Sequence, residues 1–134
     1  MAGYLLDSNA FLWIKTHPGQ IGSKALAELA EPSNRLYVSI AGLWELAIKS
    51  AMGKLDIFER LIGRDDAALR ESLRESGILL LQMDVSHVLL AARLPMHHRD
   101  PFDRMMIAQA KRENLTIVTR DAIFARYDVS VVQI

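Results

Sequence analysis

Four acidic residues stand where apolar segments of this 134-residue chain begin or end. Asp7 closes the run YLLD, Glu45 interrupts LWELAIK, Asp103 lies within DPFDRMMIAQA, and Asp121 follows LTIVTR. Carboxylates gathered in one place would repel one another and raise one another's pKa values unless a cation joined them. Carboxylate oxygens suit hard divalent cations, so this residue set predicts a site for Mg²⁺ or Mn²⁺.

A divalent cation held by carboxylates can activate a water molecule and neutralise charge on a scissile phosphate. The chemistry that this pattern predicts is hydrolysis of a phosphodiester by in-line attack, which leaves a 3′-hydroxyl and a 5′-phosphate. Thr119 ends the run before Asp121, where its hydroxyl could bond a carboxylate or a phosphate oxygen. The acids therefore indicate a metal-dependent phosphodiesterase.

The elements that must position these acids alternate along the chain. Short apolar runs predict strands buried on both faces of a parallel sheet, at residues 4–7, 36–39, 78–82, 115–119 and 129–133. Helical patterns lie at residues 8–15, 22–30, 40–52, 56–62, 65–76, 84–93, 101–113 and 121–127. We therefore expect one domain over residues 1–134, an α/β/α three-layer sandwich with a mainly parallel central sheet. In such a sheet the acids would converge at one edge.

Each acid also has a local explanation. Asp7 and Asp121 both come between a strand and a helix, where a carboxylate caps the helix. Glu45 could form an exposed pair with Lys49 one turn later. Against this, apolar residues surround Glu45 on its helix, and a carboxylate in such surroundings needs a partner. Capping explains each position separately, but it does not explain why all four lie where strand ends converge.

The DPFDR segment offers two acids. We assign Asp103 to chemistry and Asp100 mainly to capping the helix that begins at Pro101. His97 and His98 precede this segment without other His or Cys residues at zinc-ligand spacing, so we interpret them as loop residues.

Composition limits the function further. Sixteen basic and sixteen acidic residues give a formal net charge of zero, so any attraction to nucleic acid must come from a local basic rim and a bound metal. The absence of cysteine excludes thiolate metal sites and a cysteine nucleophile. No apolar run approaches the length of a membrane span and no signal peptide is evident, so we expect a cytoplasmic protein that does not contact membranes.

Four ordered segments, LLDSNAFLW, LWELAIKSAMGKL, HHRDPFDRMMIAQA and LTIVTRD, resemble the PIN-domain ribonucleases. More narrowly, they are similar to the VapC toxins of bacterial type II toxin–antitoxin systems. The resemblance implies a PIN fold and endoribonuclease activity that depends on Mg²⁺ or Mn²⁺. It also implies inhibition by a cognate VapB-type antitoxin, with a homodimer and a higher toxin–antitoxin assembly.

The resemblance also assigns roles to residues. The family's catalytic and metal-binding acids correspond to Asp7, Glu45, Asp103 and Asp121, and its small hydroxyl residue corresponds to Thr119. Many relatives have Thr-His after the first acid, whereas this chain has Ser8 and Asn9, of which Ser8 keeps the hydroxyl.

Basic residues flank the acids in sequence. We expect Arg104 and Arg120, with Ser8 and Thr119, to bind the RNA substrate, because the guanidinium fork matches phosphate geometry. Ordinary solvated surface is the alternative for either arginine.

Other interpretations stay open. Phe11, Trp13, Trp44 and Met52 recur at helical spacing and fit core packing, or an apolar groove or dimer face. A haloacid-dehalogenase-type phosphatase would have a second Asp where Asn9 stands. A receiver domain or a catalytically inactive PIN-like binding module are the alternatives that are not enzymes.

Overall fold

The computed structural model describes residues 2–53 and 65–134, and the helix expected at 56–62 lies outside them. Five strands form one sheet in the order β3-β2-β1-β4-β5, and every neighbouring pair is parallel. The strands are β1 (Gly3–Leu6), β2 (Arg35–Ser39), β3 (Ile78–Leu81), β4 (Thr116–Thr119) and β5 (Val131–Gln133). All five predicted strands are confirmed.

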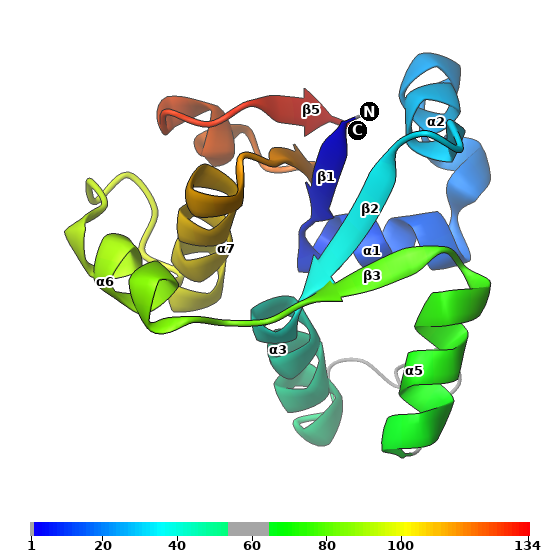
Figure 1. The fold of residues 1–134 in the computed structure, drawn as a ribbon, viewed down its shortest axis with the longest axis horizontal. Helices are drawn as coiled ribbons and strands as arrows, with labels where there is room; N and C mark the ends of the chain where they lie inside the picture. Colours follow the sequence, from blue (N-terminus) through cyan, green and yellow to red (C-terminus); the bar gives the residue numbers. More distant parts are fainter. Residues whose placement is uncertain (1, 54–64) are drawn as a thin grey trace.

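Helices cover both faces of the sheet. They are α1 (Ser8–Thr16), α2 (Ser23–Ala30), α3 (Ile40–Ala51), α5 (Asp66–Glu75), α6 (Val85–Arg93) and α7 (Pro101–Glu113). Figure 1 shows α6 and α7 on one side of the sheet and α1, α2 and α5 on the other. The predicted three-layer sandwich is confirmed. The helix expected at 121–127 is the 3-10 helix η2 (Ala122–Arg126), and a second 3-10 helix, η1 (Pro18–Gln20), precedes α2.

Alternation along the strands divides the core in two. On β1, Tyr4 and Leu6 pack with Phe11 in the cluster beneath α1, α2 and α5. Leu5, between them, faces the opposite cluster, where Ile107 of α7 lies. Because each strand is covered on both faces, its residues read as a continuous apolar run in the sequence.

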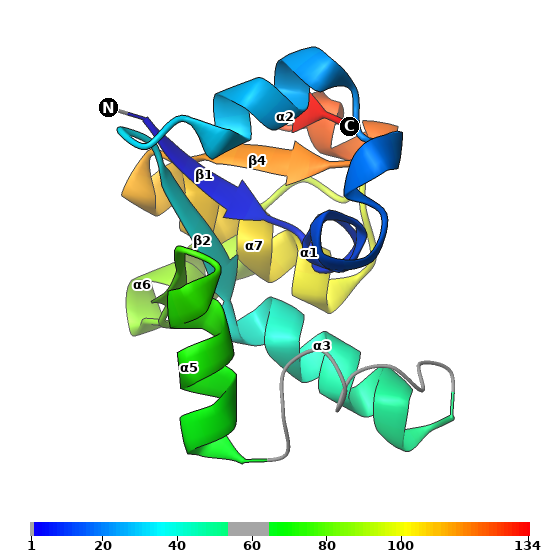
Figure 2. The ribbon, with the colours of Figure 1, turned by 90° about the vertical axis from the view of Figure 1, so that its right-hand side faces the viewer.

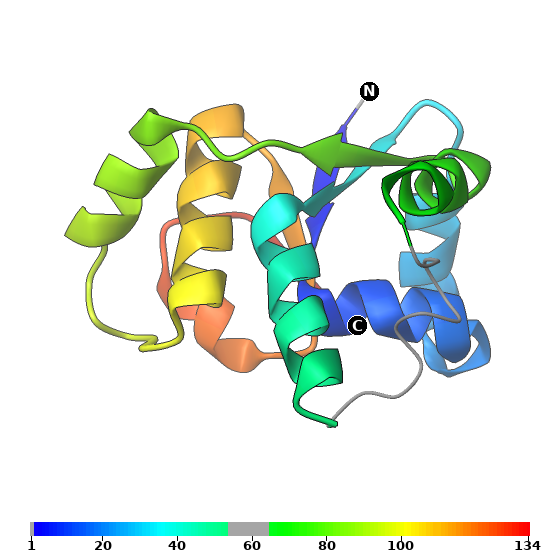
Figure 3. The same ribbon diagram turned by 90° about the horizontal axis from the view of Figure 1, so that it is seen from below.

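The carboxyl ends of the strands meet at one edge of the sheet. In Figure 2 the arrows of β1 and β4 point the same way, toward α1. Seen from below, α3 lies beside α7, with α1 on its other side (Figure 3), and α3 packs against both. The buried Ser39 hydroxyl, at the end of β2, donates to Gln109 Oε1 of α7 at 2.6 Å and fixes α7 against this edge.

The strand order also bears on the alternatives. Receiver domains have the order 2-1-3-4-5, in which the third strand is central. Here β3 lies at the edge of the sheet beside β2, so the receiver interpretation is wrong. Within the described residues, no helix combines the length and the apolar character needed to cross a membrane.

Candidate active site

Asp7 is the first residue after β1 and is buried. One carboxylate oxygen accepts the backbone N–H of Ala10 at 2.7 Å and so caps α1. The other accepts the hydroxyl of Thr119 at 2.5 Å. Burial raises the pKa of Asp7 above its usual value, while the bonds from Thr119 and Ala10 oppose the rise and the charge of Glu45 adds to it. Asp7 therefore caps α1 and at the same time belongs to the acidic cluster.

Glu45 lies on α3 and is also buried. Its Oε1 accepts the hydroxyl of Ser8, and its Oε2 lies 3.4 Å from Nζ of Lys49. The two helices lie close together here, since the Ser8 hydroxyl is also 3.4 Å from the backbone carbonyl oxygen of Gly42. The predicted pair of Glu45 with Lys49 exists. It involves only Oε2 of Glu45, while Oε1 faces Ser8 on α1.

Asp103 lies in the first turn of α7 with its side chain largely buried. Burial raises its pKa to about 8, and the charges of Asp100, Glu45, Asp7 and Asp121 add to the rise, in that order. All three other acids of the proposed site thus act electrostatically on this carboxyl. Asp100 accepts the backbone N–H of Phe102 at 2.8 Å and caps α7, as predicted.

Asp121 follows β4 and caps η2 by accepting the backbone N–H of Ile123 at 2.9 Å. Thr119 joins Asp121 to Asp7. Its hydroxyl oxygen accepts the backbone N–H of Asp121 at 2.9 Å, and the same hydroxyl donates a hydrogen bond to Asp7. One threonine therefore sets the positions of two acids, one after each of the neighbouring strands β1 and β4.

His98 is the residue that sequence reasoning missed. Its Nε2 lies 2.8 Å from Asp103 Oδ2 and 3.3 Å from Asp121 Oδ2, although neither contact has hydrogen-bond geometry. Its Nδ1 accepts the backbone N–H of Asp100 at 3.2 Å, so in the neutral ring the proton resides on Nε2. The loop prediction holds for the backbone of this residue, but the ring reaches between two carboxylates. The spacing of His and Cys residues gave no sign of this role, because the groups near the His98 ring are carboxylate oxygens.

The arrangement fits a divalent cation. His98, Asp103 and Asp121 each have a potential ligand atom within 4.8 Å of the others, and the charges of Asp7 and Glu45 act on Asp103. Burial and the surrounding carboxylates raise the pKa of Asp103 beside the buried Nε2 of His98, so positive charge would be stabilised at this place. Because Nε2 carries the proton, the carboxylates are the better ligands.

The two predicted substrate-binding arginines lie in different surroundings. Arg104 is buried, and its guanidinium donates to the backbone carbonyls of Ala91, Leu94, Pro95 and His98. These hydrogen bonds hold the α6–α7 connection in place, and they give no support to a role of Arg104 in substrate binding. Arg120 is exposed and lies next to Asp121.

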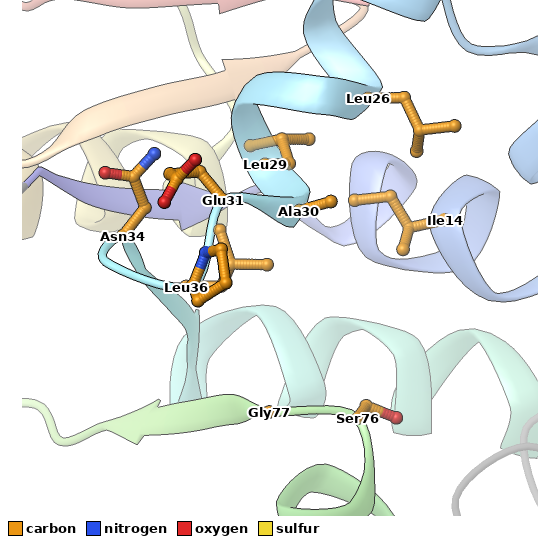
Figure 4. Close-up of a pocket in the computed structure, with 10 residues that line it drawn as sticks. Ile14, Leu26, Leu29, Ala30, Glu31, Asn34, Leu36, Ser76 and Gly77 are labelled. Carbon is orange, nitrogen blue, oxygen red and sulfur yellow. The ribbon is translucent and has the colours of Figure 1, made fainter.

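A pocket of about 350 Å³ lies elsewhere, near the start of β2 and β3. Figure 4 shows it lined by Ile14, Leu26 and Leu29, with Gly77 on its other side. None of the four acids lines it, so this apolar pocket is separate from the acidic cluster.

The comparisons with known proteins agree with the observed fold. A family model described as the PIN domain matches residues 4–130. This chain belongs to the PIN-domain family. A search of curated proteins by sequence found no match.

Solved structures share the PIN fold of this chain. A structure of VapBC2 from Rickettsia felis, bound to a DNA fragment from its promoter, matches with a TM-score of 0.70 and 17% identity over 98% of each chain. FitAcB from Neisseria gonorrhoeae matches with a TM-score of 0.63 and 24% identity, over 97% of this chain and 96% of that one. VapBC-5 from Mycobacterium tuberculosis matches with 0.61 and 21% over the full length of both.

Proposed function

We propose that this PIN domain is an endoribonuclease that depends on Mg²⁺ or Mn²⁺ and acts in the cytoplasm as the VapC-type toxin of a toxin–antitoxin pair. The observation that carries the proposal is the convergence of Asp7, Glu45, Asp103 and Asp121 at one edge of the sheet, with the pKa values of Asp7 and Asp103 raised. These acids are proposed both as metal ligands and as the catalytic residues.

Each residue has a distinct task in this mechanism. Thr119 donates to one oxygen of Asp7 and Ser8 to one oxygen of Glu45, so the two hydroxyls fix the orientation of two carboxylates that would hold the cation. His98 would position Asp103 and Asp121, since its Nε2 lies 2.8 Å and 3.3 Å from their Oδ2 atoms. When bound, the cation would supply an activated water and neutralise charge on the scissile phosphate.

A cleavage assay tests the activity. Purified protein is expected to cut RNA with Mg²⁺ or Mn²⁺ and to stop in excess EDTA. Asp103→Asn is expected to abolish cutting, while Asp128→Asn, which makes the same change at a fully exposed position, should cut as the wild type does. Equal cutting by Asp103→Asn and the wild type, or undiminished cutting in EDTA, would overturn the proposed mechanism.

The toxin role is supported by the fold shared with the VapBC complexes. A short reading frame beside the gene is expected to encode the antitoxin. Its product, co-expressed, should co-purify with this chain, suppress RNA cleavage and relieve growth arrest. Growth arrest by Asp103→Asn as strong as that by the wild type would contradict a nucleolytic toxin.

We also propose that the chain forms a homodimer through the exposed face around Trp44. The Trp44 ring, 58% exposed as a residue, meets Phe102 edge-on at 5.2 Å, and both line an apolar hollow of about 240 Å³ with Met83 and Met105. Trp44→Glu should shift the sedimenting species from dimer to monomer. Met52→Glu is the control, since Met52 is equally exposed and lies at the other end of α3. Dimers that persist in Trp44→Glu would exclude this face. Phe11, by contrast, is fully buried in the core.

A further inference from the structure

Arg120 lies at the rim of the acidic cluster, between Thr119 and Asp121 in the bend that follows β4. Its guanidinium carbon sits over the ring of Trp13, 3.9 Å from the ring centroid. Trp13 belongs to α1, the helix that begins after Asp7 and packs against β4. A flat cationic stack therefore joins the elements that carry two of the four acids.

The surroundings of Arg120 leave its hydrogen-bond donors available. In residues 2–53 and 65–134 no carboxylate forms an ion pair with it, in contrast to Arg104, whose donors are taken up by backbone carbonyls. A guanidinium that stacks on an aromatic face keeps its N–H groups at its edge, where they can form a fork with a phosphate. The ring also limits the conformations of the long side chain, so less entropy is lost when a ligand binds.

A second aromatic ring lies beside this stack and is tilted relative to it. The exposed His17 ring lies 4.7 Å from the Trp13 ring, at an interplanar angle of 46°. Flat rings and guanidinium planes beside a cation are the features on which unstacked bases of single-stranded nucleic acid lie. A duplex hides its base faces and could use only the charge. Since the chain has no net charge, a local cation must also supply the attraction to a polyanion.

We propose that Arg120 binds the backbone phosphate next to the scissile one in single-stranded RNA, and that Trp13 is the positioning residue that holds Arg120 for this contact. This inference rests on the proposed ribonuclease function and adds to it the means by which the substrate is gripped. Trp13, which the sequence pattern assigned to a core or a groove, gains a separate task.

Binding measurements test the phosphate contact. Anisotropy of a labelled, mixed-sequence pool of single-stranded RNA is followed against salt, in EDTA and in the Asp7→Asn background, where cleavage is expected to stop. Arg120→Ala should weaken binding about tenfold and lower the slope of log K against log salt by about 0.7, the value for one phosphate on a single strand. Arg120→Lys should keep the slope while losing part of the affinity. Arg35→Ala, the same change at the start of β2 and so at the opposite edge of the sheet, should alter neither.

A double-mutant cycle tests Trp13. Trp13→Leu should weaken RNA binding about threefold, Trp13→Phe should restore most of the loss, and Trp13→Leu should have no further effect once Arg120 is alanine. A purely structural role would lower affinity equally in both backgrounds and would overturn the assignment of Trp13. Melting temperatures of every variant show whether the fold is retained.

Cleavage by the otherwise wild-type chain separates this inference from the proposed function. With Mg²⁺ or Mn²⁺ present, Arg120→Ala should raise KM about tenfold and leave kcat nearly unchanged. If the wild type cuts RNA and Arg120→Ala cuts with the same KM, the inference fails and the ribonuclease function stands. Equal affinity for duplex and single strand would also overturn it. If the wild type neither binds nor cuts RNA, the proposed function fails and the inference fails with it.

Discussion

The two halves of the acidic cluster are held in different ways. In the first half, Asp7 accepts a hydrogen bond from the Thr119 hydroxyl and Glu45 accepts one from the Ser8 hydroxyl. The second half consists of Asp103 and Asp121, which face each other across His98 without a well-formed hydrogen bond to it. Hydroxyl groups of the protein thus donate to the carboxylates of the first half. The carboxylates of the second half lack such donors, and their negative charges repel each other. A cation would therefore act most strongly on the second half.

Removing one negative charge from either half should show the difference between the halves most clearly, in Mn²⁺ affinity and in melting temperature. Asp103→Asn is expected to weaken Mn²⁺ binding by more than about a hundredfold, beyond the range for residues that only support ligands. In metal-free buffer at pH 8 it should raise the melting temperature by about 5 °C, because a buried carboxylate no longer has to ionise.

Asp7→Asn is the matched variant for the first half. Asparagine can still cap α1, and the hydrogen bonds from Thr119 and Ala10 already counteract the rise in the pKa of Asp7, so its gain in melting temperature should be smaller. Calorimetry of both variants checks the comparison. A larger gain for Asp7→Asn would reverse it.

The pH dependence follows from Asp103, whose pKa is raised to about 8. Its folded pKa exceeds its unfolded one near 4, so the folded state favours the proton. The metal-free protein should therefore lose stability as the pH rises from about 4 to about 8. A proton on Asp103 competes with metal, so the apparent affinity for Mn²⁺ should rise about tenfold per pH unit from 6 to 8 and then level off. Thermal melts and titration calorimetry measure both trends, and Asp103→Asn should flatten them; a flat profile in the wild type would show that Asp103 ionises normally.

His98 should have the next largest effect. His98→Ala is expected to weaken Mn²⁺ binding by about ten- to a hundredfold, the usual cost of removing a residue that orients metal ligands. His97→Ala is the control, because the exposed His97 ring packs on the ring of Tyr127, 5.1 Å away, and the variant should bind Mn²⁺ as the wild type does. Equal affinities in the two variants would remove His98 from the site.

Thr119 joins the halves, and its replacement should cost least. Thr119→Val keeps the shape but removes both the donor to Asp7 and the acceptor of the Asp121 N–H. We expect a loss of about 1 kcal/mol in the free energy of unfolding and about tenfold in Mn²⁺ affinity. Thr119→Ser should recover both, as measured by denaturant unfolding and calorimetry. A Thr119→Val protein with wild-type values would show that the halves are positioned independently.

The fold was accessible to sequence reasoning because its strands are buried on both faces and read as apolar runs. The acids were accessible for a related reason, since each stands where such a run ends or beside a helix start. Asp100 as the cap of α7 followed from the Pro101 after it. These features are local, and local patterns suffice to find them.

The parts that the sequence could not supply depend on side-chain direction. Arg104 and Arg120 both adjoin a proposed ligand in sequence, yet Arg104 turns inward to backbone carbonyls and Arg120 turns outward onto Trp13. His98, whose backbone carbonyl accepts from Arg104, reaches Asp103 from the α6–α7 connection. Such directions are set by contacts between distant residues and leave no periodic signal.

The most direct test of the central claim is a crystal soaked in Mn²⁺ and measured at the manganese absorption edge. The account predicts an anomalous peak bounded by carboxylate oxygens of Asp7, Glu45, Asp103 and Asp121, and loss of that peak in Asp103→Asn. A saturated crystal with no peak among these oxygens, or a peak that persists unchanged in Asp103→Asn, would contradict it.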